Sequence, residues 1–117
     1  MHVEVRTDNH IHGSEKLFEE IADGLKNTLR HHENQITRVE VHLADVNGPK
    51  GAADDIRCLM EARLAHHQPI VASHQAGTLD DAIDGASAKL ARSLEHTLGR
   101  LHDHKGHQTS VGGEQVI

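Results

Sequence analysis

The stretch Asp81-Ala-Ile-Asp-Gly-Ala-Ser-Ala-Lys-Leu-Ala-Arg-Ser-Leu94 decides the fold, because it places apolar residues at the three- and four-residue steps of an amphipathic helix. The same step continues on both sides, which predicts a long final helix whose buried face is formed by Leu79, Ile83, Ala86, Leu90, Leu94, Leu98 and Leu101. Thr78 and the aspartates that follow suit the start of this helix, where caps and negative charge are favoured. Residues 105–117 carry few apolar side chains, which predicts a flexible tail after a folded domain over residues 1–104.

Upstream of this helix, alternating apolar and polar residues predict four β-strands. The alternation covers residues 2–7, 37–43 and 55–64, and a shorter run over 70–76 follows a break at 66–69. Between the first two strands a helix is predicted from Ser14 to about Arg30, with a buried face of Leu17, Phe18, Ile21, Leu25 and Leu29. The predicted fold is α+β in the order β-α-β-β-β-α, a four-stranded mixed sheet with two helices packed on one face. A helix between the first two strands allows them to be parallel, and the later strands are expected to be antiparallel.

Length and composition restrict the class of protein. A chain of 117 residues suits one domain, and its 36% hydrophobic content with Phe18 as the single Phe, Tyr or Trp requires an aliphatic core. No apolar run reaches the roughly 20 residues of a membrane span, and the first residues do not resemble a signal peptide, so we expect a cytoplasmic protein without a membrane partner. Cys58 is the only cysteine, and its alternating context predicts a buried small side chain.

The charge is distributed unevenly. The chain has 12 Lys and Arg against 18 Asp and Glu, a formal net charge of −6, which by itself disfavours nucleic acid as a partner. On the last helix, however, Lys89, Arg92, His96 and Arg100 follow one another at helical steps, and on the first helix Lys26 and Arg30 are four apart. Two interpretations remain open. The cations form a solvated face paired with Asp23, Glu95 or Asp103, or both sets border one groove between the helices and contact RNA phosphates.

Two segments, Ala82-Ile83-Asp84-Gly85 and Lys89-Leu90-Ala91-Arg92, together resemble the second helix of the ribosome hibernation promoting factors, a family that includes the ribosome-associated translation inhibitors. The resemblance implies the same β-α-β-β-β-α fold. It also implies a non-catalytic protein that binds rRNA and ribosomal proteins of the small ribosomal subunit and blocks the tRNA and mRNA sites under stress. Longer family members carry a C-terminal dimerising domain, so this chain looks like a short form, and we expect a monomer off the ribosome.

Family members bind rRNA through basic residues on both helices. The resemblance therefore implies that the rRNA-binding residues here are Lys26, Arg30, Lys89, Arg92, His96, Arg100 and Lys105. Because the chain lacks Tyr and Trp, base stacking on single strands is disfavoured, and contact with the backbone and shape of folded RNA fits better. The alternative function is a diverged protein-interaction or stress module of the same fold, whose acidic surface meets a basic protein.

Other chemistry has little support. The chain has thirteen histidines, but the spacing of the cluster His102, His104 and His107 does not supply the converging ligands of a zinc site, so no metal or cofactor is expected. No nucleophile motif is present, and helix capping accounts for the aspartates at 80, 81 and 84, so no catalytic residue or small-molecule substrate is expected. Protonation of every histidine would move the formal charge from −6 to +7, and we therefore hypothesise that mild acid strengthens RNA affinity.

Overall fold

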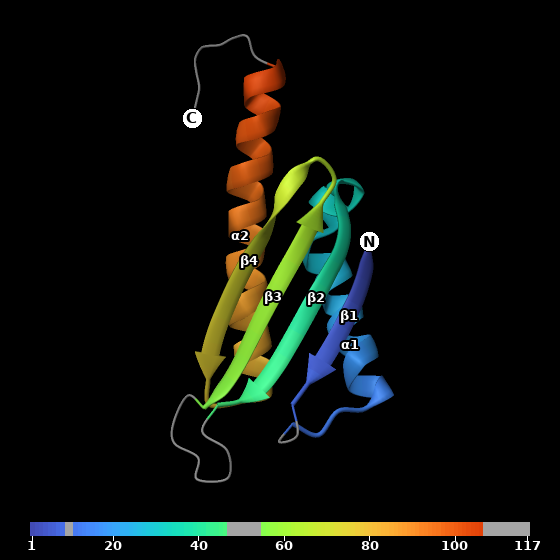
Figure 1. The fold of residues 1–117 in the computed structure, drawn as a ribbon, viewed down its shortest axis with the longest axis vertical. Coiled ribbons are helices and arrows are strands. Elements are labelled where there is room, and N and C mark those ends of the chain that lie inside the picture. The colour runs from blue at the N-terminus through green and yellow to red at the C-terminus, as the bar shows by residue number, and fades with distance from the viewer. Residues whose placement is uncertain (9–10, 47–54, 107–117) are drawn as a thin grey trace.

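The computed structural model describes residues 1–8, 11–46 and 55–106, and of residues 100–106 it describes the helical backbone alone. Its elements are β1 (His2–Thr7), α1 (Glu15–Thr28), a 3-10 helix η1 (Arg30–Gln35), β2 (Ile36–Asp45), β3 (Ile56–Leu64), β4 (His67–Ala76) and α2 (Leu79–Gly106). Figure 1 shows these elements along the chain. The predicted α+β fold and its β-α-β-β-β-α order are confirmed, with η1 as an addition.

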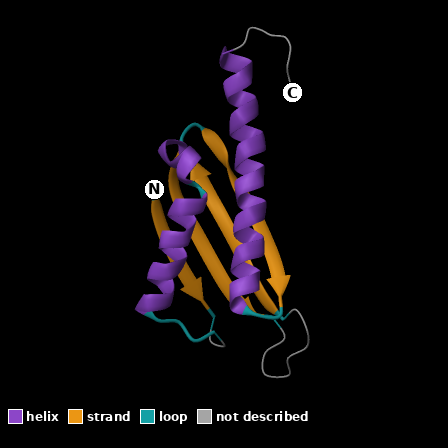
Figure 2. Ribbon diagram, turned by 180° about the vertical axis from the view of Figure 1, so that it is seen from behind, coloured by secondary structure: helices purple, strands orange, loops and turns teal. Residues whose placement is uncertain are grey.

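The four strands form one sheet in the order β1-β2-β3-β4. β1 runs parallel to β2, with Val3 opposite Val39 and Val5 opposite Val41. The other two pairs are antiparallel, as predicted. The parallel pair requires a crossover connection, which α1 supplies. Figure 2 shows α1 and α2 side by side on one face of the sheet, with their first turns at the same end of the molecule.

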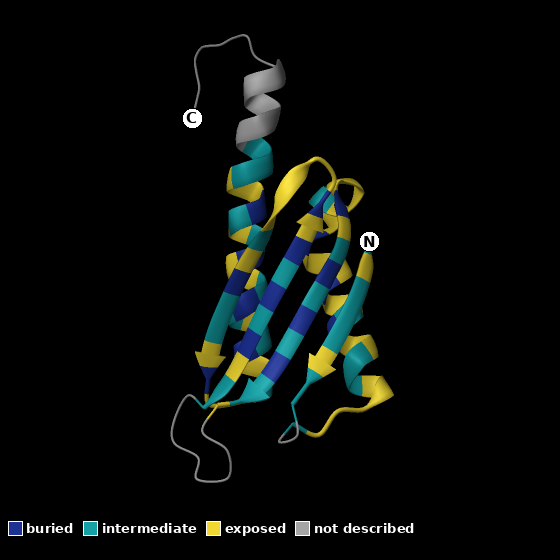
Figure 3. Cartoon of the chain, in the orientation of Figure 1, coloured by how far each residue is buried: buried dark blue, intermediate teal, exposed yellow. Residues whose placement is uncertain are grey.

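The core lies between this sheet face and the two helices. Alternate residues of β2 and β3 point into it, which gives the banded burial of these strands in Figure 3. The helices contribute residues at three- and four-residue steps. Together, the fully buried side chains of the core include Leu25, Leu29, Val39, Val41, Leu43, Met60, Leu90 and Leu94. Ser14 caps the start of α1 as predicted, and its hydroxyl oxygen accepts a hydrogen bond of 3.1 Å from the Leu17 amide.

The largest differences from the predicted element boundaries are at the start of β4 and at the end of α2. The break predicted over residues 66–69 is shorter, because only Ala65 and His66 separate β3 from β4, and His66 takes a positive φ of 66° in this turn. Pro69 therefore lies inside β4, which is compatible with a strand because β4 is at the edge of the sheet. α2 continues to Gly106, past the predicted end of its apolar stripe, so residues 105 and 106 of the predicted tail are helical. The rest of that tail lies outside the described residues.

A glycine lets α2 approach β4 closely. A Cβ atom at Gly85 would overlap the imidazole ring of His74, which projects from β4 towards the helix. Ala82 and Ala86, the neighbouring α2 residues that face the sheet, are fully buried and also small. Gly24 in α1 is different, because an added Cβ atom there would meet nothing within 4 Å.

This contrast predicts opposite effects of the same substitution. Gly85→Ala should lower the free energy of unfolding by about 1–3 kcal/mol, because the methyl group overpacks against His74. Gly24→Ala should raise it by up to about 1 kcal/mol through helix propensity. Urea unfolding followed by circular dichroism measures both. If the mechanism is correct, Gly85→Ala should cost much less in a His74→Ala background, whereas an equal cost in both backgrounds would exclude the overlap with His74.

Cys58 is the only cysteine, and it is fully buried on β3. Burial raises the pKa of its thiol to about 12, since a thiolate would lose its hydration. We expect the native protein at pH 8 to react with a disulfide reagent only as fast as it unfolds, and protein unfolded in urea to react at once. Rapid reaction of the folded protein would contradict this packing. Because the folded pKa is raised, the stability contributed by the neutral thiol is lost only at pH values above its unfolded pKa.

Candidate nucleic-acid interface

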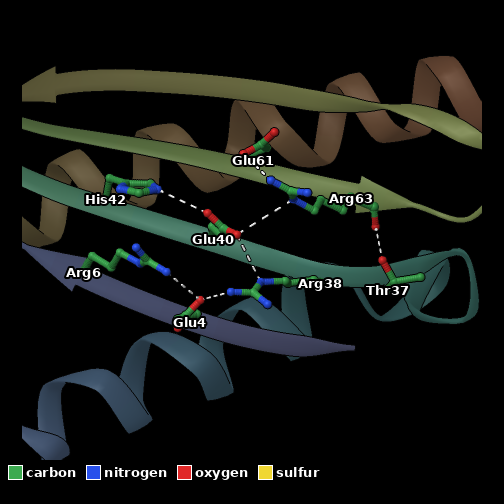
Figure 4. Close-up of polar contacts among 8 residues, drawn as sticks. All are labelled: Glu4, Arg6, Thr37, Arg38, Glu40, His42, Glu61 and Arg63. Atoms are coloured by element: carbon green, nitrogen blue, oxygen red, sulfur yellow. Dashed lines mark hydrogen bonds and ion pairs between the residues drawn. The ribbon is translucent and has the colours of Figure 1, made fainter.

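The outer face of the sheet is charged, but its charges pair with one another. Figure 4 shows the network, which crosses β1, β2 and β3. Glu4 is contacted by Arg6 at 3.2 Å and by Arg38, and Arg38 Nε is 3.1 Å from Glu40 Oε2. The remaining contacts are longer, at 3.5–3.8 Å, and join Glu40 to His42 and Arg63, and Arg63 to Glu61.

This network engages most of the arginines of the sheet. The hydrogen bond from Arg6, opposed by partial desolvation and assisted by the charge of Arg38, lowers the pKa of the Glu4 carboxyl. Three glutamates offset three arginines, so this part of the outer face has little net charge to offer an RNA phosphate. Some of these pairs join neighbouring strands and stabilise the sheet, so cations able to bind an anion must come mainly from the helices.

The helix layer is electrically polarised along its length. The first turns of both helices carry acidic residues, among them Glu15 in α1 and Asp80 and Asp81 in α2. α1 also carries Lys16 in its first turn, but there Glu15, Glu19 and Glu20 outnumber it. The other helix cations with described side chains come later, with Lys26 in the last turn of α1 and Lys89 near the midpoint of the described side chains of α2. Because the helices run in the same direction, one end of the layer is acidic and the other is richer in cations.

The groove between the two helices is acidic, which contradicts the interpretation that both sets of cations border it. Its lining residues contain no Lys or Arg and are Leu17, Glu20, Ile21, Gly24, Leu25, Thr28, Asp80, Ile83, Asp84 and Ser87. The prediction failed because it did not fix which side of each helix faces the other. Lys26 follows the lining residue Gly24 by two positions, about 200° around the helix, and so lies on a different side of α1.

The cations of α2 instead border a hollow beside the edge strand. We call this hollow the α2–β4 groove; it is lined by Val71, Ala72, Lys89, Arg92, Ser93, His96 and Thr97 and has a volume of about 560 Å³. Lys89, Arg92 and His96 are exposed, and their spacing of three and four residues places them on one side of α2. The sequence thus predicted correctly that these three lie together, and the structure supplies β4 as the opposite wall.

The groove cations are not neutralised by ion pairs. The Nζ atom of Lys89 donates a hydrogen bond of 3.2 Å to the Ser73 carbonyl on β4, and no described carboxylate lies in salt-bridge range of Lys89 or Arg92. Glu95, one of the partners predicted for these cations, contacts His32 of η1 at 3.4 Å instead. A carbonyl leaves the positive charge of Lys89 uncompensated, so the ammonium group can still bind an anion.

The remaining predicted site residues lie elsewhere. Lys26 and Arg30 are exposed, the first in α1 and the second at the start of η1, and neither lines the α2–β4 groove. Arg100 and Lys105 are in the last turns of α2, and their side chains are outside the described residues. The sequence-based prediction missed Ser93, Thr97 and Val71. The helical spacing of Ser93 and Thr97 beside the cations was a usable signal, but nothing in the sequence placed Val71 of β4 opposite them.

Metal-ligating side chains do not converge in the described part of the chain. Within the described ranges, no group of three or more His, Cys, Asp or Glu side chains could hold a metal ion. The cluster from His102 to His107 falls where side chains are not described. Among the described helices, none is long and apolar enough to cross a membrane.

Comparison with known proteins gives one family and a set of similar folds. The family model described as sigma 54 modulation protein / S30EA ribosomal protein matches residues 3–102. The N-terminal domain of Protein Y from Thermus thermophilus superposes with a TM-score of 0.65 at 13% identity, over 83% of this chain and 99% of that domain. A ribosomal subunit interface protein from Coxiella burnetii gives 0.62 at 13% identity, over 85% and 99%. A search of curated proteins finds no match.

Proposed function

The chain belongs to the sigma 54 modulation protein / S30EA ribosomal protein family, a family of ribosome-associated modulation factors, and from this premise we propose that it is a non-catalytic translation inhibitor acting on the small ribosomal subunit. It binds rRNA phosphates, occupies the tRNA and mRNA sites under stress, and acts by steric exclusion in the cytoplasm. It is a monomer away from the ribosome and needs no cofactor.

The observation that carries this proposal is the α2–β4 groove, where Lys89 and Arg92 are exposed and have no described carboxylate partner. Phosphate binding requires cations of this kind, held in place but not neutralised. Screening at physiological salt limits the reach of exposed charges to about 8 Å, so the local cations outweigh the distant acidic end of the molecule. The net charge of −6 is therefore compatible with a local RNA contact.

We propose further ribosome contacts for the other predicted residues. Lys26 and Arg30 are outside the groove, so we assign them to a separate contact with rRNA or a ribosomal protein. Arg100 and Lys105 continue α2 beyond the groove and extend the same contact. The similar fold from Coxiella burnetii is that of a ribosomal subunit interface protein, which agrees with a position on the ribosome.

Co-sedimentation with separated ribosomal subunits tests the proposal. The wild-type protein should bind small subunits, and its affinity should fall steeply as salt rises because phosphate binding releases counterions. Lys89→Ala/Arg92→Ala should lower the affinity about tenfold or more and reduce the salt slope by about 1 to 2. Lys16→Ala/Arg57→Ala removes the same charge from exposed positions outside the groove and should change both much less.

The outcomes separate the two candidate functions. If folded wild-type protein binds no subunit at any salt concentration, ribosome binding is excluded. The diverged interaction module then becomes the better-supported function, and the acidic groove between α1 and α2 is where a basic protein would bind.

A pH titration tests the hypothesis about histidine charge. Affinity for small subunits, measured at constant salt, should rise as the pH falls from about 7.5 to about 5.5, because histidines gain positive charge. An affinity that is flat over this range would rule out a role for protonation.

A further inference from the structure

The α2–β4 groove has two hydroxyl groups below its rim of cations. Ser93 and Thr97 are half-buried, whereas Lys89, Arg92 and His96 are exposed. The two hydroxyl residues are four positions apart, so they project from the same side of α2 about 6 Å apart along its axis. A ligand that enters the groove therefore meets cations first and hydroxyls further in.

These hydroxyls are not used within the described fold. Serine and threonine in a helix commonly donate to the backbone carbonyl three or four residues earlier. Ser87 does so, donating 3.1 Å to the Asp84 carbonyl. Ser93 and Thr97 have no hydrogen-bond partner among the residues that the structure describes. Two half-buried polar groups thus remain available to a ligand.

The opposite wall of the groove disfavours an added β-strand as that ligand. β4 is an edge strand, which often recruits another strand through its free backbone groups. Here the Lys89 ammonium lies against the Ser73 carbonyl and uses it as an acceptor. Lysine over an edge is a common device against strand pairing. Val71 beside it is 54% exposed and offers a small apolar surface.

An RNA strand matches this order of groups. Its phosphates are anionic and lie on the outside, and each ribose carries a 2′-hydroxyl that can both donate and accept a hydrogen bond. Phosphates on Lys89 and Arg92 would bring riboses towards Ser93 and Thr97. The volume of about 560 Å³ lies within the range of ligand sites, roughly 300–1,000 Å³, and the lining contains no Phe, Tyr or Trp ring for stacking a base.

We propose that Ser93 and Thr97 hydrogen-bond the ribose 2′-hydroxyls of the RNA strand whose phosphates are bound by Lys89 and Arg92. These two residues make the groove selective for RNA over nucleic acids that lack this hydroxyl. The inference rests on the proposed function, because it assumes that this groove meets RNA, and it adds the chemical feature that the groove recognises.

The test compares an RNA hairpin with the same hairpin carrying 2′-fluoro sugars, with binding measured by fluorescence anisotropy at low salt. The fluorinated hairpin keeps the charge and the A-form shape but lacks the hydroxyl donor. Wild-type protein should bind the RNA about fivefold to tenfold more tightly, as expected for one or two hydrogen bonds. Ser93→Ala/Thr97→Val should bind both hairpins equally and keep the wild-type salt slope.

Two further variants serve as controls. Lys89→Ala/Arg92→Ala should weaken binding to both hairpins and leave their ratio unchanged, because it removes phosphate contacts alone. Ser87→Ala, on the side of α2 that faces α1, should match the wild type. Thermal unfolding by circular dichroism verifies that each variant is folded.

Three results would overturn the inference. They are equal binding of both hairpins by the wild type, a full preference retained in Ser93→Ala/Thr97→Val, and no binding of the RNA hairpin at all. Co-sedimentation with small subunits then decides the proposed function independently. Binding there without a ribose preference removes only the role of Ser93 and Thr97.

Discussion

The close approach of α2 to β4 is the packing constraint on which the rest of this structure depends. Gly85 leaves room for the ring of His74, and the buried Ala82 and Ala86 keep the same stretch of helix near the sheet. Larger residues would lift the helix, because packed interiors tolerate little added volume. At this distance Lys89 reaches the Ser73 carbonyl, and the space beside the two elements becomes a groove with two defined walls.

The uneven distribution of charge then decides which surface can bind an anionic partner. Three arginines on the outer face of the sheet are paired with glutamates in one network, and acidic residues of the helix layer gather at the helix N-termini, where the dipole favours them. Apart from Lys16 and Arg57, the described exposed cations available to an anionic partner lie in the second half of the layer. An acidic protein can thus present a basic site, since screening makes binding depend on local charge more than on the total.

The proposed function rests on two independent kinds of observation. Family membership connects the chain to ribosome-associated modulation factors, while the likeness to solved structures at 13% identity concerns the fold alone. The α2–β4 groove is the site that we propose for this association, with exposed cations outside and half-buried hydroxyls within. RNA binding would use cations that the fold positions without neutralising them and hydroxyl groups that make no hydrogen bond within the described fold. The groove differs in this respect from the outer face of the sheet, where the charged groups pair with one another.

The sequence alone determined the order of elements, most core positions and the grouping of Lys89, Arg92 and His96, because helix and strand periodicities are local properties of the chain. Phe18, predicted on the buried face of the first helix, is only half-buried and lies outside the core cluster. Only the tertiary structure decided what these cations face. Each helix is free to present either flank to its neighbour until packing fixes its rotation, and that rotation made the groove between α1 and α2 acidic and turned the cations towards β4. Pro69 inside a strand, the contact of Gly85 with His74 and the position of Val71 were likewise set by contacts between distant segments, which no local pattern records.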